Sequence, residues 1–149
     1  MPRLATYLIP DPETRLYQIA SAILGYDVFA ERELPLPEPL QPHADRIRDW
    51  VGPAHIYGFH ATIGDALEYP GELVPEIEGR LADIARDTAP FTLTNGRIHD
   101  SFRDFPRALV STFDSPDRAV NRLEERVVTE INALHIGSPE FGTRVAAYT

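Results

Sequence analysis

The chain of 149 residues contains no cysteine and no lysine. Without cysteine it can form no disulfide bond and no thiolate metal site, and it has no cysteine nucleophile. Its apolar runs are only a few residues long, far short of the roughly 20 residues with which a helix spans a bilayer. The chain opens Met1-Pro2-Arg3-Leu4 and continues as a strand-like run instead of a signal peptide. We therefore expect a cytoplasmic protein with no membrane partner.

The charge balance further restricts the kinds of partner that the chain is expected to bind. Fourteen basic residues, all arginine, face 23 acidic residues and give a net charge of −9. Binding along duplex DNA or long RNA depends on neutralising phosphates, so this charge argues against such partners. It leaves room for a small phosphorylated substrate held by a local site. The sequence predicts no particular oligomeric state.

Hydrophobic periodicity and turn residues predict strands mixed with helices. We expect strands over residues 4–9, 56–63, 91–102 and 107–113, with a turn over residues 103–106 and a further strand start over residues 144–147. We expect helices from Asp11 to Gly25, over residues 44–51, over residues 71–89 and from Ser115 onward, with a proline-rich loop over residues 33–42. This order predicts one α+β domain over residues 1–149, with helices packed on the outer face of an antiparallel-rich sheet.

The run Tyr57-Gly58-Phe59-His60-Ala61-Thr62-Ile63 carries the candidate chemistry. On a strand, alternate residues share a face, so His60 and Thr62 are expected to point the same way. The threonine hydroxyl can donate to a phosphoryl oxygen, and the imidazole can take or give a proton near neutral pH. The competing interpretation is a histidine that is simply packed on a half-exposed strand.

This run, preceded by Pro53-Ala54-His55, resembles the first H-x-T motif of the 2H phosphoesterase superfamily, with its RNA ligase-like and cyclic phosphodiesterase-like members, and most of all its phosphonate-metabolism-type branch. The stretches TYLIPDPETRLYQIASAILGYD, APFTLTNGRIHDSF and RALVSTF are also similar to parts of such proteins. The resemblance implies a 2H phosphoesterase-like α+β fold in which two H-x-[ST] motifs face each other across a cleft. One histidine then acts as general base and the other as general acid, without metal or cofactor. Only His60, as acid or base, and Thr62, as phosphate ligand, match.

The second motif has several candidates. His99-Asp100-Ser101 has the H-x-S spacing but follows His60 by only 39 residues, where the resemblance places a crossing strand. Residues 141–146 can be aligned with the second motif, and Arg144 then stands where the histidine should be; an arginine can clamp phosphate but cannot serve as a general acid. His135 is better explained as a cation at a helix C-terminus. A further alternative is that the second motif follows Thr149 and that residues 1–149 lack the part that carries it.

Three further residues are candidate substrate contacts. Tyr7 can stack on a base or sugar, Tyr57 opens the motif run, and Arg107 can contact phosphate. The alternatives are a core position for Tyr7 and a solvated arginine after a turn for Arg107. His43 and His55 lie in proline-rich loops with no ligand spacing.

Together these features predict a metal-independent phosphodiesterase that acts on a small phosphodiester or 2′,3′-cyclic phosphate of a nucleotide or ribose derivative. The alternative function is a non-catalytic phosphate- or nucleotide-binding module with an incomplete catalytic pair. A third hypothesis is a structural domain in which His60 is only packed.

Overall fold

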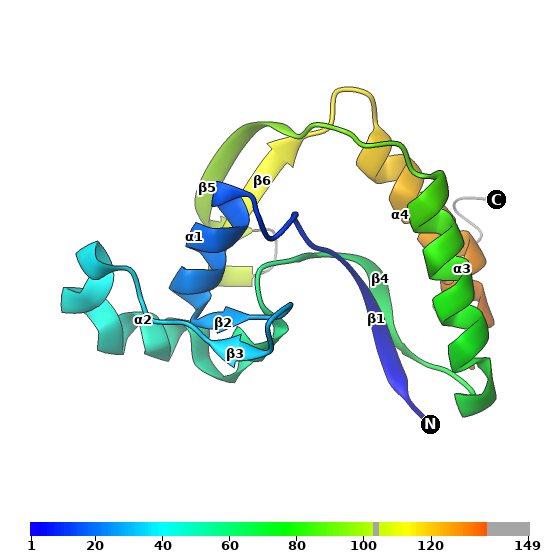
Figure 1. Cartoon of the computed structure of the whole chain (residues 1–149), viewed down its shortest axis with the longest axis horizontal. Coiled ribbons are helices and arrows are strands. Elements are labelled where there is room, and N and C mark those ends of the chain that lie inside the picture. The colour runs from blue at the N-terminus through cyan, green and yellow to red at the C-terminus, as the bar shows by residue number, and fades with distance from the viewer. Residues whose placement is uncertain (103–104, 137–149) are drawn as a thin grey trace. The chain divides into compact units, whose positions relative to one another are not determined.

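A computed structural model describes residues 1–102 and 105–136 as a mixed α+β structure with small antiparallel sheets (Figure 1). Its α-helices are α1 (Arg15–Leu24), α2 (Ala44–Val51), α3 (Val74–Asp87) and α4 (Ala119–Glu130). Its strands are β1 (Arg3–Leu8), β2 (Tyr26–Asp27), β3 (Arg32–Glu33), β4 (Ala61–Glu68), β5 (Thr94–Phe102) and β6 (Phe105–Asp114). Short 3₁₀ helices are η1 (Glu38–His43), η2 (Gly52–Tyr57), η3 (Gly71–Leu73) and η4 (Asn132–Leu134). The described strands pair as β1–β4, β2–β3 and β5–β6.

The chain divides into two compact units. Unit 1 comprises Met1–Thr6 and Ile63–Thr149, and unit 2 comprises Tyr7–Thr62. The expectation of one domain over residues 1–149 stays a prediction.

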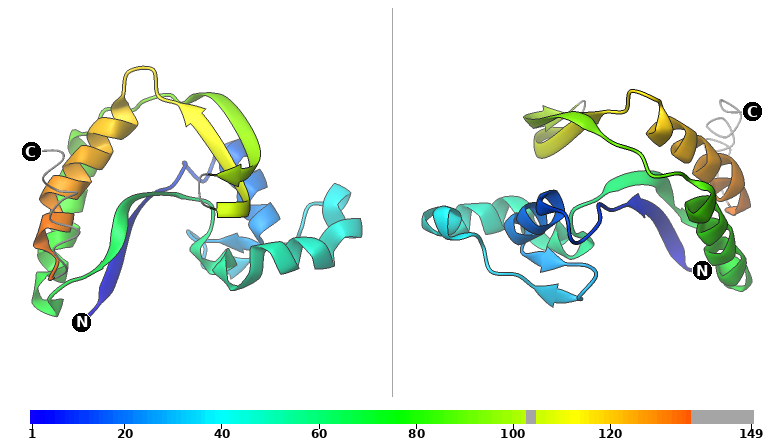
Figure 2. Two further views of the ribbon diagram at one scale, coloured as in Figure 1. Left: turned by 180° about the vertical axis from the view of Figure 1, so that it is seen from behind. Right: turned by 45° about the horizontal axis from the view of Figure 1, so that its top comes forward.

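The core of unit 1 lies along α3 and α4, which are side by side in both views of Figure 2. Apolar residues at helical spacing face inward: Ile77 and Ile84 on α3, and Ala119, Leu123, Val127 and Val128 on α4, followed by Ile131. The Arg80 guanidinium donates to the Glu130 carbonyl oxygen at 3.2 Å and so ties the two helices together. The predicted helix over residues 71–89 is confirmed as η3 followed by α3.

β1 and β4 form a two-stranded pair, and residues 3–6 of β1 and 63–68 of β4 belong to unit 1. The Tyr69 amide donates to the Pro2 carbonyl oxygen at 3.1 Å, and the Arg3 Nε donates to the Ala66 carbonyl oxygen at 3.0 Å. A Cβ added at Gly64 would lie 2.8 Å from Val127 Cγ1 and 3.0 Å from Thr6 Cβ. α4 therefore approaches the strand pair closely at Gly64, and a glycine is needed there because no space remains for a side chain.

The strands β5 and β6 form an antiparallel pair, as the sequence predicts for this segment. The register runs from Thr94↔Asp114 to Phe102↔Phe105, with irregularities between Thr94 and Arg97 and between His99 and Ser101. β6 begins at Phe105, inside the turn expected over residues 103–106. Residues 103–104 and the strand start expected over residues 144–147 lie outside the described residues.

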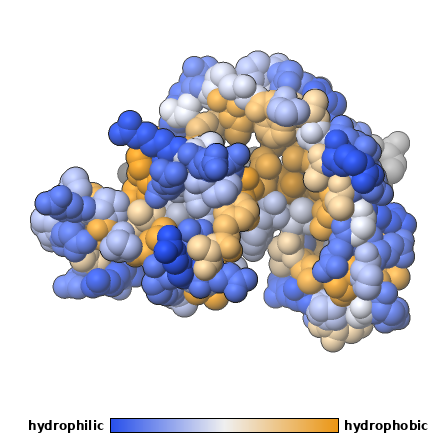
Figure 3. All heavy atoms as spheres, viewed as in Figure 1, coloured by the Kyte–Doolittle hydropathy of each residue, from blue (hydrophilic) through white to orange (hydrophobic). Residues whose placement is uncertain are grey.

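Unit 2 is built from α1, the short β2–β3 pair, η1, α2 and η2. Thr14 caps α1 by accepting from the Tyr17 amide, and Gly25 ends it with φ of 88° and an amide that donates to the Ser21 carbonyl oxygen at 2.7 Å. Among the described side chains of this unit, only Tyr17 and Ser21 are buried. Several large apolar side chains are exposed instead: Leu16, Ile19, Phe29, Trp50, Ile56 and Tyr57. The surface over α2, at the left of Figure 3, is mostly hydrophilic.

Several predicted boundaries are wrong. The strand expected over residues 56–63 is replaced by η2, which ends at Tyr57, and by β4, which begins only at Ala61. α1 begins at Arg15 because the Asp11 carboxylate accepts from the Glu13 amide and forms a turn ahead of the helix. α4 begins at Ala119, since Ser115 to Arg118 form a separate turn. The described strands also form three pairs instead of one sheet.

Candidate functional site

His60 lies in unit 2, at the end of a tight turn that leads into β4. Gly58 sets this turn with φ of 65° and ψ of −170°, a conformation that is essentially confined to glycine. The Gly58 amide donates to the His55 carbonyl oxygen at 2.9 Å and closes η2. The Gly58 carbonyl oxygen lies 3.0 Å from His60 Nδ1. One glycine thus both ends η2 and provides the backbone contact of the candidate catalytic histidine.

The imidazole of His60 is held in one orientation. A carbonyl oxygen can only accept a hydrogen bond, so Nδ1 of His60 must donate to Gly58 and carries the proton of the neutral ring. The ring also stacks on Tyr7, with centroids 3.9 Å apart and planes inclined by 23°. Among the described residues, Nε2 has no hydrogen-bond partner. The neutral ring therefore presents the lone pair of Nε2, which is the form that a general base requires.

A chain of contacts supports the turn. A Cβ added at Gly58 would lie 2.3 Å from Val28 Cγ1, so Val28 packs directly on the glycine. The Tyr17 hydroxyl donates to Asp27 Oδ1 at 2.8 Å and accepts from the Val28 amide at 3.2 Å. Asp27 Oδ1 also accepts from the amides of Phe29 and Ala30. The hydrogen bond from Tyr17 lowers the pKa of the Asp27 carboxyl below its ordinary value, with smaller contributions from the two amides.

The other residues of the predicted run are less enclosed. Thr62 is the second residue of β4 and is exposed. Tyr57 is the last residue of η2, and its side chain is 54% exposed. The structure therefore brings Tyr7 to His60 and leaves Thr62 and Tyr57 open to solvent, and the roles of all four stay predictions.

The candidates for the second half-site are in unit 1. His99 is on β5, and its Nε2 lies 2.8 Å from Thr112 Oγ1 on β6, which explains its position as a cross-strand contact. Ser101 and Arg107 are on β5 and β6, but their side chains lie outside the described part of the chain. Arg144 lies outside the described residues altogether.

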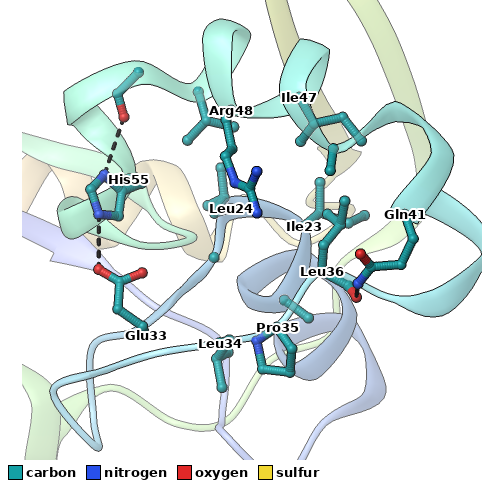
Figure 4. A pocket seen from close by; sticks show the side chains of 15 residues that line it. Ile23, Leu24, Glu33, Leu34, Pro35, Leu36, Gln41, Ile47, Arg48 and His55 are labelled. Carbon is teal, nitrogen blue, oxygen red and sulfur yellow. Dashed lines mark hydrogen bonds and ion pairs between the residues drawn. The ribbon is translucent and has the colours of Figure 1, made fainter.

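A cavity of about 480 Å³ lies within unit 2, between α1, α2 and the segment Glu33–Leu36 (Figure 4). Its apolar lining consists of Ile23, Leu24, Leu34, Leu36, Ile47 and Val51, among others. Its wall includes a contact that the sequence interpretation missed: His55 Nε2 lies 3.2 Å from Glu33 Oε1, and His55 Nδ1 lies 3.1 Å from the Gly52 carbonyl oxygen. Glu33 and His55 are 22 positions apart in the chain, and this separation gives no spacing signal that could have paired them.

The described residues contain neither a cluster of metal ligands nor a helix that could span a membrane. No group of three or more histidine, aspartate or glutamate side chains in the described part of the chain is arranged to hold a metal ion. No helix among residues 1–102 and 105–136 has both the length and the apolar composition needed to cross a bilayer.

Comparison with known proteins gives one informative likeness. No family model matches the chain, and no solved structure matches it. The chain is similar to a protein of Laribacter hongkongensis (strain HLHK9) named ribose 1,5-bisphosphate phosphokinase PhnN, with 36% identity over 94 residues. The match covers 62% of this chain and 22% of that protein, so the chain spans only about a fifth of the relative that it matches.

Proposed function

We propose that this chain is part of a 2H-type phosphoesterase that hydrolyses a small phosphodiester or 2′,3′-cyclic phosphate of a nucleotide or ribose derivative without a metal ion. The observation that carries the proposal is the orientation of His60. Its Nδ1 donates to Gly58, its ring stacks on Tyr7 and its Nε2 is left for proton transfer. This arrangement stands within the H-x-T motif, two residues before the hydroxyl of Thr62.

The proposed chemistry needs one proton acceptor and one proton donor. Nε2 of His60 takes a proton from water while the water oxygen attacks phosphorus. The bond from phosphorus to the 2′ or 3′ oxygen breaks, and that oxygen is protonated by an acid of the second half-site, which leaves a phosphate monoester. The Thr62 hydroxyl donates to a phosphoryl oxygen whose negative charge increases in the transition state.

The likeness to PhnN supports a phosphorylated ribose as the ligand class. The name of that protein assigns it ribose 1,5-bisphosphate as a substrate and a kinase activity. The chain described here has no lysine, so it holds no P-loop lysine of the kind that reaches the phosphates of a bound nucleotide. We therefore carry over the sugar phosphate as a candidate ligand and leave out the phosphoryl transfer.

The test is hydrolysis of 2′,3′-cyclic nucleotides and phosphoribosyl cyclic phosphates in the presence of EDTA. We expect turnover by the unaltered chain and a loss of about 10²-fold or more in kcat for His60→Ala. Thr62→Val, which removes the hydroxyl but keeps the shape, should lower kcat by about tenfold or more. His43→Ala alters another histidine of the same unit and should leave the rate unchanged. Absence of turnover, or equal rates for His60→Ala and His43→Ala, would refute the proposal.

A second candidate function is a phosphate-binding module without turnover. It is favoured by the sequence at the second motif, where Arg144 stands at the position of the histidine and an arginine cannot serve as a general acid. The two functions differ in one measurement. A module binds a cyclic phosphate, with a shift of the His60 ring signals in NMR spectra, and releases no monoester.

A further inference from the structure

We propose that the unit 2 cavity is a separate binding site for a small organic anion, namely an apolar body that carries a single carboxylate or phosphate group. The cavity of about 480 Å³ falls within the range of pockets that enclose small molecules, and its lining is mainly aliphatic. All of its lining residues belong to unit 2. The site is distinct from the His60 imidazole, which is not among them.

The apolar lining defines the body of the ligand. Ile23 and Leu24 come from α1, Leu34 and Leu36 from the following segment, and Ile47 from α2. Three separate parts of the chain thus present aliphatic side chains to one space (Figure 4). Removing a hydrocarbon or aromatic ring from water into this space is favourable in proportion to the apolar area that it buries.

The charged residues of the lining define the head group. His55 Nε2 lies 3.2 Å from Glu33 Oε1, so the carboxylate of the lining is already in contact with the imidazole. The guanidinium of Arg48 is the other charged group of the lining, and its ion pair is with Asp45, which is not a lining residue. In Figure 4 the Arg48 side chain reaches among the lining residues. A guanidinium binds carboxylate and phosphate with matched geometry.

The present partner of Arg48 is weakly held. Arg48 Nη1 lies 3.4 Å from Asp45 Oδ1, and both side chains are largely exposed, with Arg48 at 76%. Exposed ion pairs of this kind contribute little to the stability of the fold, since water competes for both charged groups. An anion held by the apolar lining could therefore replace Asp45 at low cost. Gln41 is already engaged, because its Nε2 donates to the Leu36 carbonyl oxygen at 2.6 Å.

The test is a titration of the whole chain with phenylacetate, followed by ¹H–¹⁵N NMR. We expect saturable shifts at residues 22–25, 33–36 and 44–52, and weaker binding of the neutral phenylacetamide and of 2-phenylethylamine. Phenyl phosphate in place of phenylacetate distinguishes a phosphate head from a carboxylate head. Binding of either one supports the site, whereas failure of both overturns it. Inorganic phosphate has no apolar body and tests whether that body is needed for binding. If phosphate causes NMR shifts as large as those caused by phenylacetate, the proposal is contradicted.

Matched variants on α2 distinguish the effect of the Arg48 charge on binding from a general effect of substitution on the fold. Arg48→Gln should raise the Kd of phenylacetate by about tenfold, as expected for the loss of one charge-assisted hydrogen bond. Arg46→Gln removes a charge from the same helix, where Arg46 stacks on Trp50 at 4.5 Å, and should change Kd by less than about twofold. Asp45→Asn should lower Kd because it removes the competing carboxylate. Equal effects of Arg48→Gln and Arg46→Gln would overturn the assignment.

One further variant makes this proposal independent of the proposed hydrolysis. His60→Ala should leave the binding of phenylacetate unchanged while it removes turnover. If turnover is absent and phenylacetate still binds in an Arg48-dependent way, the cavity site stands and the phosphoesterase proposal fails. If phenylacetate does not bind and hydrolysis depends on His60, the phosphoesterase proposal stands and the cavity site fails.

Discussion

At Gly58 the absence of a side chain decides where His60 lies. The backbone has φ of 65°, and Val28 occupies the space that a Cβ would need. Both facts act on the same residue, since the carbonyl of Gly58 accepts the hydrogen bond of His60. The orientation of the imidazole therefore depends on a position that itself does no chemistry.

We expect Gly58→Ala to lower the free energy of unfolding by about 2 kcal/mol or more, because alanine is strained in this conformation and collides with Val28. Gly79→Ala is the matched control. Gly79 lies within α3 with nothing within 4 Å of an added Cβ, so alanine should raise stability by about 0.5–1 kcal/mol. Urea denaturation measures the change in the free energy of unfolding for both variants. Changes of the same sign would contradict the interpretation of Gly58.

The Tyr17–Asp27 hydrogen bond predicts a dependence of stability on pH. The pKa of Asp27 is lowered in the folded protein, mainly by the Tyr17 hydroxyl. A lowered pKa contributes stability above the unfolded value of about 3.9, and that contribution is lost as the pH falls through the folded pKa. Tyr17→Phe should therefore unfold at lower urea concentration than the unaltered chain at pH 7, and the difference should shrink below about pH 4. A difference that is constant with pH would show that Tyr17 acts only by packing.

At the scale of elements, the contact between α4 and β4 rests on Gly64. A Cβ at this position would lie 2.8 Å from Val127 Cγ1. Gly64→Ala alone should cost about 1–3 kcal/mol through overpacking, and Val127→Ala alone about 2 kcal/mol through a cavity. The double variant should cost less than the sum by at least about 0.5 kcal/mol, since each change relieves the other. Thermal denaturation of the unaltered chain, the two single variants and the double variant measures these losses of stability. Strictly additive losses would argue against the close approach of Val127 to Gly64.

The sequence predicts long elements better than turns. The apolar spacing of Leu123 and Val127 marks the buried face of α4, and Gly25 marks the end of α1, as the structure confirms. The start of β4 is missed because the run from Ile56 to Ile63 favours a strand locally, whereas Gly58 adopts a positive φ that no periodicity reveals. The pair β2–β3 is missed because each strand has only two residues.

The candidate site is predictable only in part, and for a similar reason. The H-x-T pattern selects His60, but the stacking of Tyr7 on it joins positions 53 residues apart in the chain. The contact of Glu33 on β3 with His55 in η2 likewise depends on how two separate segments meet. Contacts of this kind follow from tertiary structure, so the residue types alone do not indicate them.

At the scale of the whole molecule, the two units differ in how many apolar side chains they bury. Nearly all of the fully buried apolar side chains lie in unit 1, among them Ile77, Ile84 and Val127, whereas Tyr17 is the buried aromatic of unit 2. Burial of apolar surface is the main favourable contribution to folding. Unit 2 should therefore be the less stable part of the chain.

Hydrogen exchange tests this difference. We expect amides of α1 and α2 to exchange at least about tenfold faster than those of α3 and α4, after correction for intrinsic rates. Mass spectrometry of peptides from the two units gives the comparison directly. Equal protection of α1 and α3 would mean that the two units unfold together.

The position of Trp50 has a spectroscopic consequence. It is the one tryptophan of the chain, it lies on α2 of unit 2, and it is 64% exposed beneath the guanidinium of Arg46. Its fluorescence therefore reports on unit 2 alone, whereas circular dichroism at 222 nm records the helices of both units. If unit 2 melts first, the two signals will follow different denaturation curves, and the chain carries its own optical label for that event.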